Sequence, residues 1–356
     1  MNKKLSYPKE KINVLLLENV DEIAKKKFIE EGYKVEVISS SLNEKELIEK
    51  IKNVSIIGIR SKTILNKKIL SSAKRLLAIG AFCIGTNQID LEFTKKKGII
   101  VFNAPYSNTR SVVEIVIGQI IFLIRNIVDK NNQMQKGIWK KNSNNSFEIR
   151  NKVLGIVGYG NIGSQLSTIA ESIGMKVIYY DKKEKLSLGN AKKYNSLNQL
   201  IKASNIISIH VDGKKENTDL IDKNEFEIMK KGTILINYSR GNVVNINELK
   251  KNILLGKIHG AAIDVFPKEP KNNNQKFSSV LIGLPNTILT PHIGGSTKEA
   301  QKNIGAFVPN KVIDFINTGA TSNSVNFPSL VLPELKNVHR FIHIHKNIPN
   351  VMLKIN

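Results

Sequence analysis

The sequence predicts an α/β protein with two doubly wound units, on three observations. The chain has 356 residues, a length typical of two domains. Short apolar runs of strand length alternate with helical patterns along most of the chain, which is typical of parallel sheets covered by helices. Near the middle, a glycine-rich turn joins one such run to a helix pattern and marks the start of the second sheet.

The first unit is expected to contain five strands. A run at 12–17 is followed by a helix pattern at 21–31, and further strands are expected at 34–38, 55–60, 76–79 and 99–102. A long apolar helix follows, capped by Ser107 or Asn108 and running to about Val128. This helix is expected to carry the chain into the second unit.

The second unit is expected to begin with a strand at Val153. Its other strands fall at 175–180, 206–209, 233–236, 261–263 and 287–289. A helix pattern from Lys298 onward is expected to return the chain to the first unit. Ligand sites occur preferentially between domains, so the cleft between the two units is the expected site.

The glycine-rich turn is Gly158-Tyr-Gly-Asn-Ile-Gly163, and it follows the apolar run Lys152–Val157. Alone this pattern is weak, because glycines also mark ordinary tight turns. Here a strand precedes it, a helix pattern follows it, and Asp181 ends the next strand. In that context the glycines allow the turn, the approach of a pyrophosphate and close packing of helix on strand. The turn therefore predicts a dinucleotide site at the helix N-terminus.

Asp181 predicts that the dinucleotide is NAD rather than NADP. A carboxylate at this strand end accepts hydrogen bonds from the adenosine ribose and repels a 2′-phosphate. Lys182 and Lys183 follow directly and soften that exclusion.

Three residues carry the expected chemistry. Arg240 follows the run 233–236, where a guanidinium suits capture of a substrate carboxylate. His292, after another strand, is placed to take a proton from a hydroxyl as hydride leaves the same carbon. Glu269 is its expected partner, orienting the imidazole and favouring its charged form. The alternatives are a surface salt bridge for Arg240 and a structural role for His292.

Composition argues against several other classes of protein. The net charge is +24, but only seven of the 54 basic residues are arginine, and no zinc or helix-turn-helix motif appears, so neither a nucleic acid partner nor a metal is expected. A positive field that attracts a phosphorylated acid is a secondary interpretation. The apolar stretch 112–124 is too short to cross a bilayer, so no membrane partner is expected. A single cysteine, Cys83, and an N-terminus without an apolar segment favour the cytoplasm.

The ordered motifs resemble a known family. The glycine-rich turn, Ser239-Arg-Gly241, Asp264-Val-Phe-Pro-Lys-Glu-Pro270 and Thr290-Pro-His-Ile-Gly-Gly-Ser-Thr297 are similar to those of the D-2-hydroxyacid dehydrogenases. More narrowly, the segments at 81–88, 101–105, 107–111 and 325–328 resemble the bacterial D-3-phosphoglycerate dehydrogenases. The resemblance covers nearly the whole chain.

The resemblance implies a role for each of these residues. Arg240, Glu269 and His292 match the catalytic triad. The implied substrate contacts are Arg60, Ser61, Asn108 and Lys141. The NAD contacts expected from the turn and from the resemblance are Gly158, Gly160, Asn161, Ile162, Gly163, Asp181, Tyr238, Ser239, Arg240, Asp264, His292, Ile293, Gly294 and Gly295.

The resemblance also implies a domain order and a reaction. A Rossmann-type NAD-binding domain at 109–295 is expected to be inserted into a flavodoxin-like substrate-binding domain at 1–108 and 296–337. The implied reaction is oxidation of 3-phospho-D-glycerate to 3-phosphooxypyruvate with NAD, the first step of L-serine biosynthesis. Some members also reduce 2-oxoglutarate to (R)-2-hydroxyglutarate with NADH. The implied assembly is a cytoplasmic homotetramer.

Two alternative functions stay open. One is another D-2-hydroxyacid dehydrogenase, acting on glycerate or hydroxypyruvate, which a substrate panel would separate. The other is a non-catalytic NADH-sensing regulator on the same scaffold, because a fold does not fix a function. The presence of all three catalytic residues argues against the regulator.

Four substitutions depart from the family pattern, one of which is Lys231 in place of a usual proline. Tyr238 stands where a small residue usually lies beside the nicotinamide, so it is expected to crowd the cofactor. Asp212 replaces a usual proline. Pro309 is expected to interrupt the returning helix, where an interior proline costs about 3 kcal/mol.

The C-terminal residues 338–356 resemble a remnant of an ACT regulatory domain. Phe341–His345 and Asn347 match the first strand and the effector loop of that serine-binding domain. A single strand cannot form its sheet, so we expect that serine does not inhibit.

Overall fold

The computed structural model describes residues 7–270, 274–333, 335, 345, 349–351 and 353. The chain divides into two compact units: unit 1 is Met1–Ser107 with Gln301–Asn356, and unit 2 is Asn108–Ala300. Unit 2 is therefore one continuous stretch of chain, inserted into unit 1. Most of the expected ACT remnant, including Phe341–Ile344 and Asn347, lies outside the described residues.

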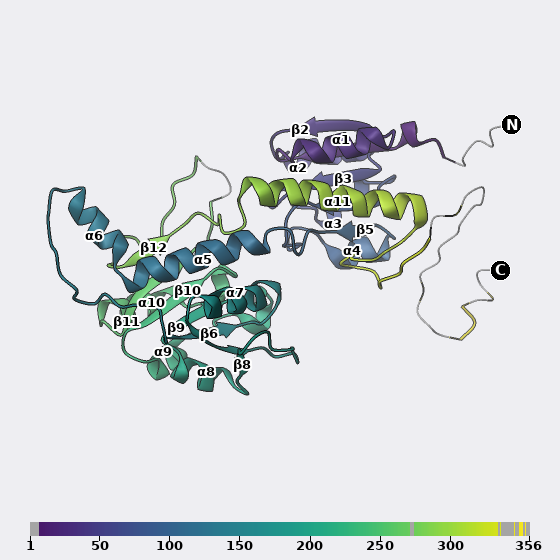
Figure 1. The fold of residues 1–356 in the computed structure, drawn as a ribbon. Helices are drawn as coiled ribbons and strands as arrows, with labels where there is room; N and C mark the ends of the chain where they lie inside the picture. Colours follow the sequence, from purple (N-terminus) through teal and green to yellow (C-terminus); the bar gives the residue numbers. More distant parts are fainter. Residues whose placement is uncertain are drawn as a thin grey trace. The chain divides into compact units, whose positions relative to one another are not determined.

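Unit 1 contains a parallel five-stranded sheet in the order β2-β1-β3-β4-β5, which is the flavodoxin-like order (Figure 1). Its strands are β1 (Asn13–Leu17), β2 (Lys34–Ile38), β3 (Ile56–Ile59), β4 (Ala78–Ala81) and β5 (Ile100–Phe102). Its helices are the short 3₁₀ turn η1 (Lys9–Lys11), α1 (Glu22–Glu30), α2 (Glu44–Ile51), α3 (Lys67–Ser72), α4 (Leu91–Lys96) and α11 (Lys298–Thr318).

The central strands of this sheet are almost entirely apolar, and helices cover both of its faces. Successive side chains of a strand point to opposite faces. Leu15 and Leu17 of β1 join the core beneath α2 and α3, whereas Val14 and Leu16 join the core beneath α1 and α11. Continuous apolar runs of this kind are typical of parallel strands buried on both sides.

The helix α11 runs through Pro309 without a break, so the expected interruption was wrong. Proline lacks an N–H group and crowds the carbonyl of the residue four positions earlier. However, Ile304, Val308 and Val312 pack into the core of unit 1. Packing of an apolar face supplies most of the stability of a helix in a protein, and here it outweighs the cost of the proline.

Unit 2 contains a parallel seven-stranded sheet in the order β12-β11-β10-β9-β6-β7-β8. Counted from β6, the first six strands follow the dinucleotide-binding order 3-2-1-4-5-6. The strands are β6 (Val153–Val157), β7 (Lys176–Tyr180), β8 (Lys192–Lys193), β9 (Ile206–Ile209), β10 (Thr233–Asn237), β11 (Ile258–Ile263) and β12 (Thr287–Leu289). The α/β fold with parallel sheets is thus confirmed.

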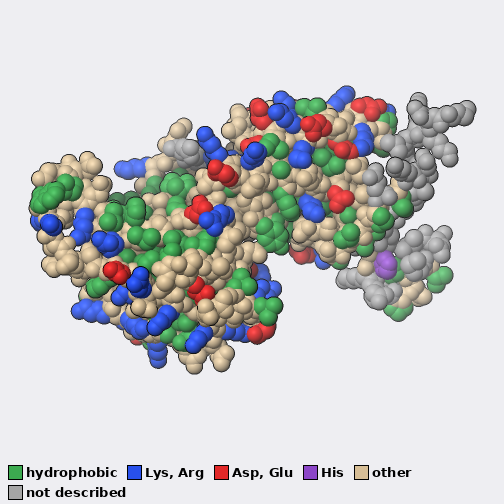
Figure 2. All heavy atoms as spheres, viewed as in Figure 1, with side chains coloured by type: hydrophobic (Ala, Val, Ile, Leu, Met, Phe, Trp, Pro, Cys, Tyr) green, Lys and Arg blue, Asp and Glu red, His purple; other side chains and the backbone are tan. Residues whose placement is uncertain are grey.

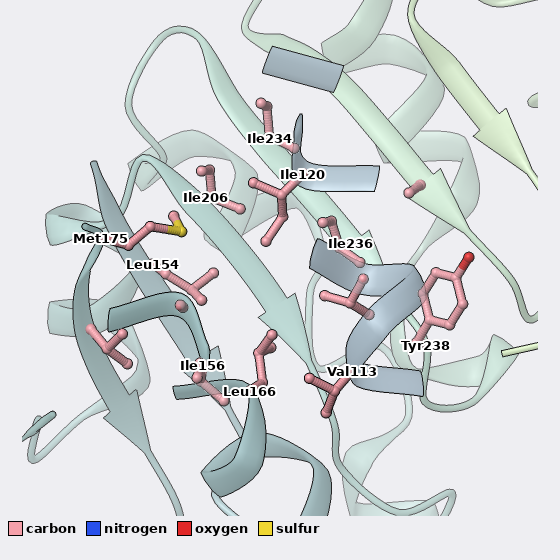
Figure 3. Close-up of a cluster of buried hydrophobic side chains, with 14 of the residues drawn as sticks. Val113, Ile120, Leu154, Ile156, Leu166, Met175, Ile206, Ile234, Ile236 and Tyr238 are labelled. Atoms are coloured by element: carbon pink, nitrogen blue, oxygen red, sulfur yellow. The ribbon is translucent and has the colours of Figure 1, made fainter. Parts of the chain in front are cut away.

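Helices cover both faces of this second sheet as well. They are α5 (Thr109–Ile124), α6 (Ile127–Met134), α7 (Asn161–Ser172), α8 (Leu197–Ala203), α9 (Lys223–Ile228) and α10 (Ile246–Leu254), with 3₁₀ turns η2 (Lys215–Asn217) and η3 (Gly241–Val243). One core lies under α5 and α7 and includes Val113, Leu166 and Ile236 (Figure 3). The other lies under α8, α9 and α10 and includes Leu200, Phe226 and Leu249.

The first helix of unit 2 is shorter than expected. It ends at Ile124 rather than near Val128, and α6 follows at a bend of 68°. Asn126 makes the bend in the left-handed region, at a φ of 51°, which asparagine tolerates better than most residues. Within the described residues no single helix is both long and apolar enough to cross a membrane, and only the bent pair of α5 and α6 together meets that test.

Candidate active site

Five segments with expected site residues follow strands of the sheet in unit 2. The glycine-rich turn follows β6, Asp181 follows β7, Arg240 follows β10, Asp264 follows β11 and His292 follows β12. Because the strands are parallel, all five segments lie at the carboxyl edge of one sheet. Open α/β sheets bind their ligands at this edge.

The three glycines of the turn each have a distinct physical reason. Gly158 has a φ of +93°, and a Cβ there would lie 2.7 Å from the carbonyl oxygen of His210. A Cβ on Gly163 would lie 2.3 Å from the carbonyl oxygen of Gly158, so α7 sits close against the turn. A Cβ on Gly160 would meet nothing within 4 Å, which leaves open space at the N-terminus of α7. That space, faced by unpaired N–H groups, fits the pyrophosphate of a dinucleotide.

Asp181 is tied to the glycine-rich turn. Its Oδ2 atom accepts a hydrogen bond from the N–H of Tyr159 at 2.8 Å, and its Oδ1 atom accepts one from the N–H of Lys183 at 2.8 Å. Each carboxylate oxygen has a second lone pair. The side chain is therefore held in place and still able to accept hydrogen bonds from ribose hydroxyls.

His292 and Glu269 form a direct pair. The Nδ1 atom of His292 lies 2.9 Å from Oε2 of Glu269, and Oε1 of Glu269 accepts a hydrogen bond from the N–H of Phe266 at 3.1 Å. Half of the His292 side chain is exposed. With Nδ1 on the carboxylate, Nε2 is the ring nitrogen left for proton exchange with a substrate.

The pKa of His292 is raised and the pKa of Glu269 is lowered, so both side chains favour their charged forms. The hydrogen bond to Glu269 raises the pKa of His292 above its usual range, against the opposing effect of burial. Burial alone would raise the pKa of the Glu269 carboxyl, but the hydrogen bond and charge of His292, the N–H of Phe266 and the charge of Arg240 together lower it. The imidazolium form of His292 is thus stabilised.

Arg240 is half-buried and held by its neighbours. Its Nη1 atom donates to the carbonyl oxygen of Ser239 at 2.7 Å, and its own carbonyl oxygen accepts from Nδ2 of Asn237 at 3.1 Å. A Cβ on Gly213 would lie 2.8 Å from Cγ of Arg240, so the absence of a side chain there leaves room for the arginine stem. Arg240, Glu269 and His292 are therefore brought together, since the charge of Arg240 acts on both partners of the pair.

A buried carboxylate anchors the loop that carries His292. Asp264 accepts hydrogen bonds from Oγ1 of Thr290 at 2.6 Å and from the N–H groups of Ile293 and Gly294, each at 2.9 Å. His292 itself has a positive φ of 55°, a strained conformation that needs such support. Asp264 thus holds the backbone on both sides of His292 in place.

Tyr238 is buried at the end of the core beneath α5, beside Val113 (Figure 3). Its hydroxyl lies 3.2 Å from Oγ1 of Thr290, and burial raises its pKa to about 12. A Cβ on Gly294 would lie 2.6 Å from the ring. The large side chain is therefore packed into the protein and supports the loop of His292.

Comparisons with known proteins agree with this geometry. Residues 117–294 match the family model of the D-isomer specific 2-hydroxyacid dehydrogenase NAD binding domain. The chain is 51% identical to a D-3-phosphoglycerate dehydrogenase of Dictyostelium discoideum, over all of this chain and 88% of that protein. It is 47% identical to the Haemophilus influenzae enzyme of the same name, over all of this chain and 87% of that one.

The chain belongs to the D-isomer specific 2-hydroxyacid dehydrogenase family. A solved structure of D-lactate dehydrogenase from Aquifex aeolicus, complexed with NAD and lactic acid, has a TM-score of 0.78 at 27% identity. The match covers 89% of this chain and all of the Aquifex aeolicus chain. The predicted family and its cofactor, NAD, are both confirmed.

The expected substrate residues of this dehydrogenase lie in both units. Arg60 and Ser61 directly follow β3 in unit 1. Asn108 precedes α5 in unit 2 without capping it through its side chain; instead a Cβ on Gly295 would lie 2.0 Å from its Nδ2 atom. The Oδ1 atom of Asn108 is buried and has no hydrogen-bond partner among the described residues. Lys141 is exposed, in the segment between α6 and β6.

Three further residues support the site, although no motif gives them a role. Asn237 accepts hydrogen bonds from the N–H and the hydroxyl of Ser239, and Thr290 links Tyr238 to Asp264. In unit 1, buried Glu18 accepts hydrogen bonds from the N–H groups that follow β3. A signal for Glu18 was present, because a charged residue stands directly after an apolar strand at a carboxyl edge.

Proposed function

We propose that this chain oxidises 3-phospho-D-glycerate to 3-phosphooxypyruvate with NAD, the first step of L-serine biosynthesis. The observation that carries the proposal is the His292–Glu269 pair with Arg240 beside it, at the carboxyl edge of an NAD-binding sheet. The names of its relatives, at 51% and 47% identity over the whole chain, support this choice among hydroxy acids.

Each catalytic side chain has one task in the reaction. NAD, when bound, would supply the acceptor for the hydride that leaves the carbon bearing the hydroxyl. His292 accepts the hydroxyl proton at Nε2, so that the carbon–oxygen bond becomes a carbonyl. Glu269 stabilises the resulting imidazolium through Nδ1. Arg240 binds the substrate carboxylate with its planar fork and holds the reacting carbon in place.

We assign the remaining substrate contacts to Arg60, Ser61, Asn108 and Lys141. Two of these are cations, which suits a substrate with both a carboxylate and a phosphate. The backbone of Arg60 is held from two sides, because its N–H donates to Glu18 and its carbonyl oxygen accepts from Nε2 of Gln88 at 2.8 Å.

The same proposal includes assembly into a homo-oligomer, a tetramer by family resemblance. Large apolar side chains lie exposed on α5, α6 and the segment that follows, and Figure 2 shows hydrophobic surface over this region. They are Ile121, Phe122, Ile127, Met134, Ile138, Trp139 and Phe147. Contiguous apolar surface of this kind marks protein contacts. The single cysteine, Cys83, fits a reducing cytoplasm.

A substrate panel tests the reaction. NADH formation would be followed with 3-phospho-D-glycerate, D-glycerate and D-lactate, and NADH consumption with 2-oxoglutarate. We expect the highest kcat/KM with 3-phospho-D-glycerate. Faster oxidation of D-glycerate would show that the substrate is unphosphorylated. No turnover with any acid, together with tight NADH binding, would show a regulator instead.

A further inference from the structure

A polar bridge spans two strand ends beside the ribose-binding carboxylate. Nζ of Lys182 donates to Oδ1 of Asn217 at 3.0 Å, and Nδ2 of Asn217 donates to Oδ1 and to the carbonyl oxygen of Asp212 at 2.7 and 3.0 Å. Lys182 follows β7, whereas Asp212 and Asn217 follow β9. The strand β6 lies between them in the sheet, so the bridge reaches across the edge where the glycine-rich turn begins.

Asp212 fixes which way the amide of Asn217 faces. The side chain of Asn217 is buried, and both donor contacts of its NH₂ group go to Asp212. The amide oxygen is thereby turned toward Lys182. The reverse orientation would place the NH₂ group against an ammonium and leave it no acceptor there. A residue at 212 without a side-chain acceptor would leave only its carbonyl oxygen for the NH₂ group, so the aspartate strengthens this orientation.

The contact of Lys182 with Asn217 matters because Lys182 lies beside the cofactor site. It directly follows Asp181, the residue placed to bind the adenosine ribose, and a cation near this strand end is what accommodates the 2′-phosphate of NADP. A lysine free to turn toward that phosphate would form a charge-assisted hydrogen bond. Instead its ammonium is held by Asn217 and lies 4.0 Å from a carboxylate oxygen of Glu216.

We infer that the Asp212–Asn217–Lys182 bridge sets the preference for NAD over NADP by holding the Lys182 ammonium on the loop 212–217. Asp181 supplies the repulsion of the 2′-phosphate, and the bridge withholds Lys182, one of the two cations directly after Asp181 that would offset it. Lys182 and Asn217 act as specificity-determining residues toward the cofactor, and Asp212 positions them. The inference rests on the dinucleotide site and is independent of which hydroxy acid is the substrate.

The test is a binding cycle on the full chain, read by calorimetric titration of NADH and NADPH. Asn217→Ala frees Lys182, and we expect the Kd for NADPH to fall about tenfold, the effect of about 1.4 kcal/mol, while the Kd for NADH changes less than about threefold. Adding Lys182→Ala should abolish the gain. An unchanged NADPH Kd, or a gain that survives without Lys182, overturns the inference.

A second pair of variants guards against misfolding, because Asn217 is buried. Asp212→Ala combined with Glu216→Ala alters only exposed side chains, and it removes the stronger of the two acceptors at residue 212 and the nearby charge. It should give the same Lys182-dependent gain for NADPH. Glu184→Ala combined with Glu227→Ala is the matched control, since it removes two exposed acids of unit 2 without touching the bridge. An equal gain in this control would mean that net charge alone explains the effect, and would overturn the inference.

Discussion

Nδ1 of His292 lies 2.9 Å from Oε2 of Glu269, and this contact decides both the orientation and the protonation of the imidazole. It raises the pKa of His292, while the same hydrogen bond opposes the effect of burial on Glu269 and lowers the pKa of that carboxyl. A group whose pKa is raised on folding keeps its proton to higher pH. The pair therefore favours the proton-donating form of His292, which reduction of a keto acid requires.

Glu269→Gln should move the pH dependence of reduction toward lower pH. Reduction needs protonated His292, so kcat/KM falls as the pH rises through its pKa. Without the carboxylate that pKa drops, and the decline should begin at lower pH; in the oxidation direction, activity should appear at lower pH. Initial rates across a pH series measure this dependence in both reaction directions. Glu248→Gln is the control: it removes an acid in α10 paired with Lys251 and should leave the pH dependence of both directions unchanged. A Glu269→Gln enzyme with the same pH dependence as the unmodified enzyme would contradict the role of the pair.

His292→Asn should lower turnover by about 10²–10⁴-fold, the usual contribution of a positioned acid or base. Asparagine is the suitable replacement because residue 292 has a φ of 55°, which asparagine tolerates. NADH binding should persist, since the anchoring of the loop by Asp264 uses backbone groups. Single-turnover rates and an NADH titration separate the two effects. Turnover like that of the unmodified enzyme would remove His292 from the reaction.

Two glycines of the same turn should respond differently to alanine. Gly163→Ala places a Cβ 2.3 Å from the carbonyl oxygen of Gly158, and overpacking of this kind costs about 1–3 kcal/mol, so Tm should fall. Gly160→Ala meets nothing in the protein, so Tm should hold, but its methyl group enters the space for the phosphates and should weaken NADH binding. Thermal unfolding and NADH titration measure both. Unaltered NADH binding by Gly160→Ala would show that the pyrophosphate lies elsewhere.

Most strands were predictable from short continuous or alternating apolar runs, and β2, β9 and β12 match the predicted ranges. The strand β8 was not, since it consists of Lys192 and Lys193 and pairs only through its backbone. The early end of α5 was missed because apolar residues continue past it, whereas the turn depends on the backbone of Asn126.

The proposed catalytic residues were selected from motifs at strand ends, but the residues that support them could not be selected in this way. The anchoring of the His292 loop depends on Asp264, Thr290 and Tyr238, which meet only when three strand ends come together. The bridge from Lys182 to Asn217 likewise joins segments separated along the chain. These contacts join residues that lie far apart in the sequence, so only the three-dimensional structure reveals them.

Glu18→Gln should raise the KM for 3-phospho-D-glycerate while NADH binding stays unchanged. The Glu18 carboxylate accepts hydrogen bonds from the N–H groups of Arg60, Lys62 and Thr63 at 3.2, 2.9 and 2.7 Å. The glutamine of the variant would turn its own NH₂ group toward one of these donors. An unsatisfied buried group costs about 1–3 kcal/mol, enough to loosen the Arg60 backbone. Steady-state kinetics measure the KM, and Tm monitors folding. Glu22→Gln, on the exposed first turn of α1, is the control; an unchanged KM would show that Arg60 does not depend on Glu18.

The insertion of unit 2 into unit 1 has a consequence for biosynthesis. Val308 of α11 packs directly on Gly80 of β4, yet α11 follows the entire inserted unit in the chain. A ribosome that adds about 5–20 residues per second needs roughly 10–40 seconds to make the intervening unit. During that interval the nascent first sheet exposes apolar surface that α11 covers only later, so this topology leaves the growing polypeptide prone to aggregation until α11 emerges.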